Sequence, residues 1–167
     1  FLMDSMAAHT TKIIRTMPNT PALVGEGITG VCKNALVTDE EFTYALSLLS
    51  SFGLAEAVPE SLMDAVVSVS GSSPAYVFMF IEAMADAAVK FGMPRKQAYI
   101  YAAQTLKGAA SMVLQEEQNP AALKDAVCSP AGTTIEAVAA LEKYGFRNAV
   151  IEAVTAAHDK SVAMGKK

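Results

Sequence analysis

Proline and glycine divide most of this sequence into helix-length segments, and this division constrains the fold more than any other feature. Beyond Pro59 the apolar residues recur at three- and four-residue spacing, as on the buried face of a helix. Breaks fall at Pro74, Gly92, Asn119-Pro120 and Gly145, which are residue types that begin or end helices. The pattern predicts a turn over 68–73 and helices over 61–67, 74–91, 95–117, 121–127, 133–144 and 147–164.

The first sixty residues have a different pattern. Short apolar runs predict strands over 12–15, 28–32 and 55–58. Between the second and third runs, residues 39–52 have helical spacing, with Thr38 or Asp39 as the N-cap. We therefore expect a mainly α chain, in which a small α/β region over 1–60 precedes an all-helical domain over 61–167.

The composition narrows the class of partner. Acidic residues outnumber basic ones, 17 to 13, for a net charge of −4, so we expect the chain to bind neither nucleic acid nor anionic membrane. The most apolar window, 75–88, contains Glu82 and Asp86 and is too short to cross a bilayer. We therefore expect a buried helix there and no membrane span.

Cysteine and histidine are too sparse for a metal centre or a disulfide framework. Cys32 and Cys128 lack the paired spacing of zinc or redox motifs, and His9 and His158 lie far from each other in the sequence. We therefore predict no metal site, and a cytoplasmic location.

The loop before the helix predicted at 133 is the segment richest in possible chemistry. Its sequence, Ser-Pro-Ala-Gly-Thr-Thr over 129–134, brings small residues to a helix start, where unpaired amides and the helix dipole favour an anion. Hydroxyls of Ser129, Thr133 and Thr134 surround the same point. The alternative is an ordinary helix start with Thr133 or Thr134 as a side-chain N-cap.

Four segments together resemble the pyrroline-5-carboxylate reductase family. Residues 15–21 (Arg-Thr-Met-Pro-Asn-Thr-Pro) resemble its strand–loop motif, and residues 70–76 (Ser-Gly-Ser-Ser-Pro-Ala-Tyr) resemble a helix entry. Residues 92–95 resemble the break between its two long helices, and residues 123–136 resemble its signature loop. Four short motifs in the family's order are far more specific than any one of them.

The resemblance implies an NADPH- or NADH-dependent oxidoreductase that reduces 1-pyrroline-5-carboxylate to L-proline, the last step of proline biosynthesis. In that family a Rossmann domain carries the dinucleotide, and a helical domain forms the substrate site and the homodimer. Residues 1–60 would then be the last part of a truncated Rossmann domain. No Gly-x-Gly-x-x-Gly segment directly follows a predicted strand, and the start of the chain resembles the interior of a longer protein. We therefore expect an inactive but dimeric fragment.

The same resemblance assigns roles to single residues. Thr134 would be catalytic, with its hydroxyl at the ring nitrogen. Residues that would lie near the nicotinamide are Asn19, Thr20 and Pro21. Residues that would bind substrate are Glu60, Glu117, Ser129, Gly132, Thr133 and Thr134.

Several of these assignments have structural alternatives. Glu117 could be a solvated helix end, and Glu60 a first-turn carboxylate favoured by the helix dipole. Ala131 stands where many members of the family have Gly, and Ala126 stands where some have an Asn that touches the cofactor, so Ala126 carries no such contact. For the whole chain the alternative is a helical dimerisation module without catalysis, to which a hydroxyl-rich loop would be superfluous.

Overall fold

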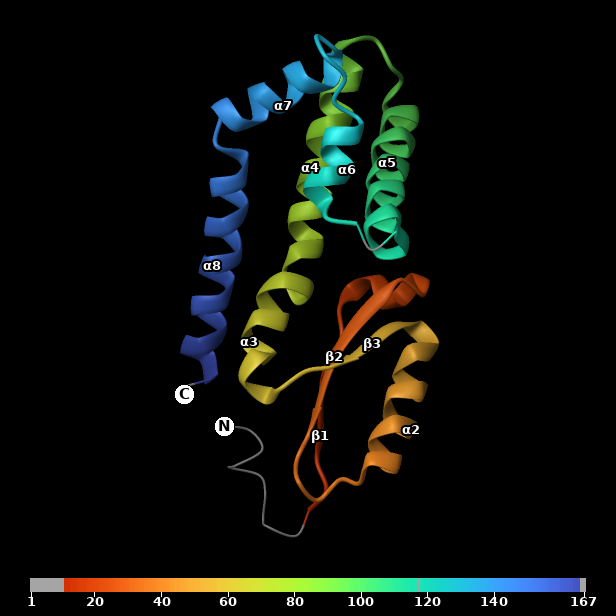
Figure 1. Ribbon diagram of the computed structural model, residues 1–167, viewed down its shortest axis with the longest axis vertical. Helices are drawn as coiled ribbons and strands as arrows, with labels where there is room; N and C mark the ends of the chain where they lie inside the picture. Colours follow the sequence, from red (N-terminus) through yellow and green to blue (C-terminus); the bar gives the residue numbers. More distant parts are fainter. Residues whose placement is uncertain (1–10, 117, 166–167) are drawn as a thin grey trace. The chain divides into compact units, whose positions relative to one another are not determined.

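The computed structural model of the chain describes residues 11–116 and 118–165 (Figure 1). These residues form two compact units, one comprising the residues up to 75 together with those from 152 onward, and the other residues 76–151. The predicted division at residue 60 stays a prediction. Each unit is described by itself.

All strands among the described residues lie in the first unit. They form one sheet in the order β1-β2-β3, in which β1 and β2 are antiparallel and β2 and β3 are parallel. Helix α2 connects the two parallel strands, as in a β-α-β unit. The strands are β1 (Ile14–Met17), β2 (Gly27–Lys33) and β3 (Gly53–Ala57), and the helix is α2 (Asp39–Leu49). All three predicted strands and this helix are confirmed, with ends shifted by a few residues.

Helix α2 covers one face of this sheet. Because successive side chains of a strand point to opposite faces, Thr29, Val31 and Lys33 share a face. Thr29 and Val31 are buried. The Lys33 ammonium group bonds the Asp39 carboxylate at the start of α2 and lies 5.3 Å from the centre of the Phe42 ring. Figure 1 shows α2 beside the strands.

A helical segment packs on the opposite face. Cys32 forms a small core with Met63 of α3 (Met63–Val66). A side chain at Gly30 would lie 2.8 Å from the Val66 Cγ1 atom, so glycine at this position allows the close approach of helix and strand. The first unit therefore has a sheet between two helical layers.

Residues 67–71 form a π-helical turn, η4 (Val67–Gly71), so the prediction of a turn over 68–73 is wrong. The Ser72 N–H donates to the Val67 carbonyl at 2.9 Å, which is the wider π-helical spacing. The hydroxyls of Ser68 and Ser70 donate to carbonyls three and four residues earlier, at 2.9 and 2.8 Å. These hydroxyls satisfy backbone carbonyls locally, and the chain continues as a helix instead of reversing.

Residues 60–90 together form one helical run that begins with a 3-10 turn, η3 (Glu60–Leu62), and ends with α4 (Ser73–Lys90). By length and composition alone, this run of 31 residues could cross a membrane. The prediction of a buried helix over 75–88 is wrong for the single chain, because within α4 only Ala85 is buried. The expectation that the chain does not bind membranes stays a prediction.

All described secondary-structure elements of the second unit are helices, joined by short loops. Its helices are α5 (Arg95–Glu116), α6 (Pro120–Ala126) and α7 (Thr133–Lys143), with most of α4 and the first turns of α8 (Phe146–Gly165). Each predicted helix is therefore confirmed to within a few residues at its ends. The mainly α fold with a small α/β region at its start is confirmed as well.

Many apolar side chains of this unit lie on its surface. Phe78 and Met79 of α4 are 63% and 68% exposed, and Leu114 of α5 is 69% exposed. Phe80 and Phe146 pack against each other, with ring centroids 5.6 Å apart. Exposed apolar area of this kind is typical of a surface that binds another protein, a membrane or a ligand.

Candidate functional site

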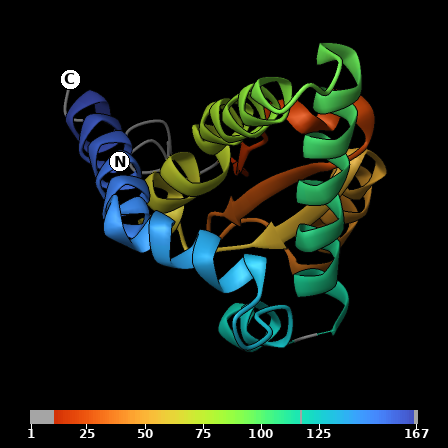
Figure 2. The same cartoon turned by 90° about the horizontal axis from the view of Figure 1, so that it is seen from above.

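The chain enters α7 through a loop whose last residue is a glycine. Helix α6 ends at Ala126, and the Gly132 N–H closes a turn by donating to the Ser129 carbonyl at 3.0 Å. Gly132 is the N-cap of α7, with extended dihedral angles of −81° and 167°. Figure 2 shows this passage from α6 (cyan) through the loop into α7 (blue).

The alternative of a helix start with Thr133 or Thr134 as its N-cap is wrong. Because Gly132 is the N-cap, Thr133 and Thr134 occupy the first two positions of the helix, and no side chain caps α7. The first amides of a helix have no acceptor within the helix. They stay available to an external anion, which the positive end of the helix dipole favours.

Two residues of this loop adopt geometries that fit small side chains. Ala131 has a φ of 58°, the one positive φ of a non-glycine residue in the described part of the chain. A side chain at Gly132 would lie 2.3 Å from the Ser129 Oγ atom and 3.1 Å from its carbonyl oxygen. Only glycine therefore lets the Ser129 hydroxyl lie this close to the helix start.

The loop is accessible within its unit. Ser129 and Thr133 are exposed, and Gly132 and Thr134 are half-buried. An anion can reach the first turn of α7 without displacing core side chains. The structure thus brings together Ser129, Gly132, Thr133 and Thr134, which the sequence nominated as substrate-binding.

The three residues nominated for cofactor binding lie in the first unit. Asn19 is the N-cap of a 3-10 helix, η1 (Thr20–Val24), in which Thr20 is exposed and Pro21 is half-buried. The Asn19 side chain is already engaged within the protein. Its Oδ1 atom accepts the Ile28 N–H at 2.9 Å, and its Nδ2 atom donates to the Ser70 carbonyl at 3.1 Å.

Glu60 is engaged in the first unit as well. It lies in the first turn of η3, and its Oε1 atom accepts a hydrogen bond from Arg15 Nη1 at 3.1 Å. Both side chains are about 30% exposed. Burial raises the pKa of the nearby Cys32 thiol, and the Glu60 charge adds to this effect while Arg15 opposes it. This geometry suits the structural alternative for Glu60.

The remaining nominated positions add little to the geometry. Glu117 lies outside the described residues, as does His9. Among the residues that are described, no three His, Cys, Asp or Glu side chains are grouped as metal ligands. Both Cys32 and Cys128 are free thiols.

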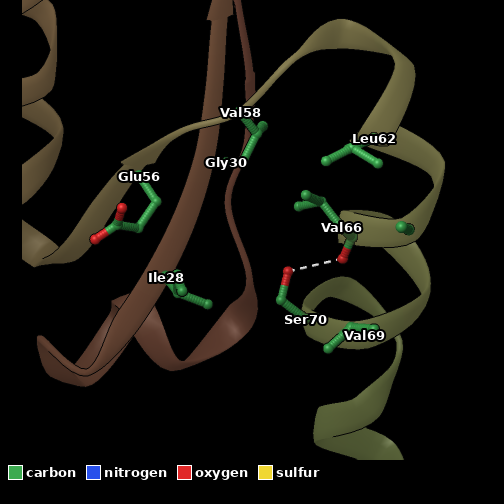
Figure 3. A pocket seen from close by; sticks show the side chains of 9 residues that line it. Ile28, Gly30, Glu56, Val58, Leu62, Val66, Val69 and Ser70 are labelled. Carbon is green, nitrogen blue, oxygen red and sulfur yellow. Dashed lines mark hydrogen bonds between the residues drawn. The ribbon is translucent and has the colours of Figure 1, made fainter. Parts of the chain in front are cut away.

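Sequence reasoning missed a cavity in the first unit, of about 280 Å³ and with almost entirely apolar walls. Figure 3 shows that strands β2 and β3 with Val58 form one wall and that the helical segment from Leu62 to Ser70 forms the other. Residues that line it are Ile28, Gly30, Glu56, Val58, Leu62, Ala65, Val66, Val69 and Ser70. Its walls come from segments that are distant in the sequence and that only the fold brings together, so the sequence carries no signal for it.

Comparison with known proteins extends the match over nearly the whole chain. The chain is 61% identical over 167 residues to pyrroline-5-carboxylate reductase of Escherichia coli strain K12, which covers 98% of this chain and 62% of that relative. The chain therefore spans less than two thirds of this relative's length.

Two solved structures share the fold. Pyrroline carboxylate reductase of Plasmodium falciparum, determined with NADP bound, has a TM-score of 0.89 and 40% identity, covering 98% of this chain and 66% of that one. A pyrroline-5-carboxylate reductase from Coxiella burnetii has a TM-score of 0.91 and 36% identity, covering 97% of this chain and 60% of that one.

The family model described as pyrroline-5-carboxylate reductase dimerisation matches residues 60–164. This range takes in all of the helical run over 60–90, the loop at 129–134 and almost all of α8. The chain belongs to the pyrroline-5-carboxylate reductase family, through its dimerisation domain.

Proposed function

We propose that the protein to which this chain belongs reduces 1-pyrroline-5-carboxylate to L-proline with NADPH or NADH, and that this chain supplies its substrate-binding loop. The observation that carries this proposal is the start of α7, where the first amides have no side-chain cap and hydroxyls stand on both sides. A site of this kind suits a small carboxylate. The names of the relatives point to the same substrate class.

Each residue of the loop then has a distinct role. The amides at the start of α7 bind the substrate carboxylate, and Ser129 and Thr133 add hydroxyl donors. The Thr134 hydroxyl hydrogen-bonds the ring nitrogen and orients the C=N bond. Glu117 follows the end of α5, and its carboxylate stabilises the positive charge of an iminium. Glu60 we assign instead to the ion pair with Arg15.

The residues of this chain fit only one end of a dinucleotide. The Gly-x-Gly-x-x-Gly match at residues 25–30 leads into strand β2 and not into a helix, so it offers no helix N-terminus for the phosphates, whereas Thr20 and Pro21 lie in an accessible turn. When bound, the nicotinamide group supplies a hydride to carbon C5 of the pyrroline ring. We propose that Thr20 and Pro21 contact its nicotinamide end and that a longer protein holds the phosphates. The 167-residue chain alone should show no cofactor-dependent turnover.

Substitution of Thr134 in the full-length protein tests this assignment. Thr134→Ala should lower kcat/KM for the pyrroline substrate at least about tenfold, or about 1.4 kcal/mol in the barrier, since it removes a hydrogen bond to the reacting C=N group. Thr134→Ser should restore most of the activity. Thr105→Ala is the matched control, because the Thr105 hydroxyl donates to the Tyr101 carbonyl within α5. Unchanged turnover in Thr134→Ala would remove Thr134 from the mechanism.

We also propose that the apolar surface of the helical unit forms a homodimer or higher homo-oligomer. The matched family model describes dimerisation, and the exposed Phe78, Met79 and Leu114 supply apolar area for an interface. Sedimentation velocity of the 167-residue chain should give at least twice the monomer mass. A monomer at micromolar concentration would contradict this proposal.

Two coarser expectations complete the proposal. We place the boundary between the α/β and helical domains at residue 60, where the match to the family model begins. We place the protein in the cytoplasm, because both cysteines are free and Cys32 is buried.

A further inference from the structure

The carbonyl of Ser70 lacks a normal partner in the helix. In an α-helix a carbonyl accepts the N–H four residues later, but the fourth residue after Ser70 is Pro74, which has no N–H. The N–H five residues later, on Ala75, donates instead to the Ser72 carbonyl at 3.2 Å. A half-buried carbonyl without a donor would destabilise the fold.

Asn19 supplies the missing donor. Its Nδ2 atom donates to the Ser70 carbonyl at 3.1 Å across 51 residues of sequence, and its Oδ1 atom accepts the Ile28 N–H at 2.9 Å. The Asn19 backbone carbonyl also accepts the Ala22 N–H at 3.2 Å, in the first turn of η1. The asparagine side chain suits this link because it donates from one atom and accepts at another, whereas aspartate lacks the donor.

The two partners of Asn19 stand on opposite walls of the apolar cavity. Figure 3 shows Ile28 on the strand side and Ser70 on the helical side. The residues that follow Asn19 are Thr20 and Pro21, which form the turn proposed to contact the nicotinamide. One side chain therefore links this turn, strand β2 and the π-helical turn.

We propose that Asn19 is a positioning residue for the cofactor, which fixes the Thr20–Pro21 turn at a set distance from the π-helical turn without itself contacting the cofactor. This inference rests on the proposed function. In this inference Asn19 acts through the residues that it holds in place, and Pro74 leaves the Ser70 carbonyl free to accept a hydrogen bond from Asn19. Loss of the link releases the turn, and binding of the nicotinamide then includes the cost of ordering it.

The test uses the full-length protein with NADPH and NADH. Asn19→Ala should raise the KM for the preferred cofactor about tenfold, while the KM for the pyrroline substrate changes less than about twofold. Asn19→Asp keeps the acceptor for Ile28 but loses the donor, so it should raise the cofactor KM as well. It is the variant to measure where Asn19→Ala does not fold.

Asn34→Ala is the matched control. The Asn34 side chain makes the same pair of bonds elsewhere in the first unit, accepting from the Ile13 N–H at 3.2 Å and donating to the Thr11 carbonyl at 2.8 Å. Asn34→Ala should lower the melting temperature and leave the cofactor KM unchanged. An equal rise in cofactor KM for Asn34→Ala, or no rise for both Asn19 variants, would overturn the inference.

Pro74→Ala separates positioning from mere stability. It provides an N–H four residues after Ser70, so the double variant Asn19→Ala, Pro74→Ala should recover part of the melting temperature lost in Asn19→Ala. The cofactor KM should stay high, because the Asn19 side chain that holds the Thr20–Pro21 turn is still missing. Recovery of both quantities would overturn the positioning role. Failure of the proposed function is distinct from failure of the positioning role. In the first case the unmodified protein itself would show no pyrroline-dependent oxidation of NADPH or NADH.

Discussion

Ala131 carries a backbone strain that a single substitution should release. Its φ of 58° lies in the left-handed region, which costs a residue with a Cβ atom about 1–2 kcal/mol. Glycine does not have this cost, but its freer unfolded chain lowers stability by about 0.4–1 kcal/mol. The side chain is exposed, so its removal loses little burial. We expect Ala131→Gly to raise the free energy of unfolding by about 0.5–1 kcal/mol.

Urea denaturation followed by circular dichroism measures this change directly. The midpoint should rise for Ala131→Gly while the m-value stays constant, since the same surface is exposed on unfolding. Ala35→Gly provides the matched control, because Ala35 is exposed in a turn and has no positive φ. It should lose about 0.4–1 kcal/mol through the unfolded state alone.

The same substitution, alanine to glycine, should raise the free energy of unfolding at residue 131 and lower it at residue 35. The two variants must therefore change in opposite directions. If Ala131→Gly lowered the midpoint as much as Ala35→Gly does, the loop would not be strained in solution. The left-handed geometry at the entry to the proposed carboxylate site would then be refuted, and the position of the Gly132 amide with it.

Three further predictions concern the first unit and the surface of helix α5. Gly53 has a φ of 145°, and an added Cβ atom would lie 2.0 Å from a carbonyl of the neighbouring strand, so Gly53→Ala should cost about 3 kcal/mol or more in urea denaturation. Gly108→Ala, on α5 with nothing within 4 Å, should instead gain about 0.5–1 kcal/mol. The Lys12 ammonium group lowers the pKa of the Glu41 carboxyl from 4.5 to about 2. The ionised Glu41 carboxylate therefore stabilises the fold above pH 4.5, and this contribution is lost as the pH falls toward 2. Glu41→Gln should therefore flatten the fall in melting temperature over this range, and Glu40→Gln should not; equal curves for the two variants would contradict the assignment.

Predictions from the sequence were most accurate where a feature depends on residues close together in the chain. The capping box of α2, in which the Glu41 N–H donates to the Thr38 hydroxyl and the Glu41 carboxylate accepts the Thr38 N–H, involves residues three apart. The helix starts at Pro120 and after Gly145 depend equally on near neighbours. The clustering of hydroxyls around the start of α7 follows from adjacency in the chain, so those candidates for the site were visible in the sequence.

Capping at α7 shows the limit of such reasoning. Serine, threonine and glycine can all precede a helix, and the sequence 132–134 offers a glycine and two threonines. The choice of Gly132 depends on its close contact with Ser129, where a Cβ atom would not fit. That contact is a property of the folded loop.

Long-range pairing was decided only by the tertiary structure. The sequence by itself indicated where most helices lie, to within a few residues, because helix ends depend largely on interactions within about four residues. It did not determine that Arg15 pairs with Glu60 or that Asn19 reaches Ser70, which are 45 and 51 residues apart. Such contacts exist only after the sheet and helices pack, since a polar group can pair with any suitable partner that the fold brings near.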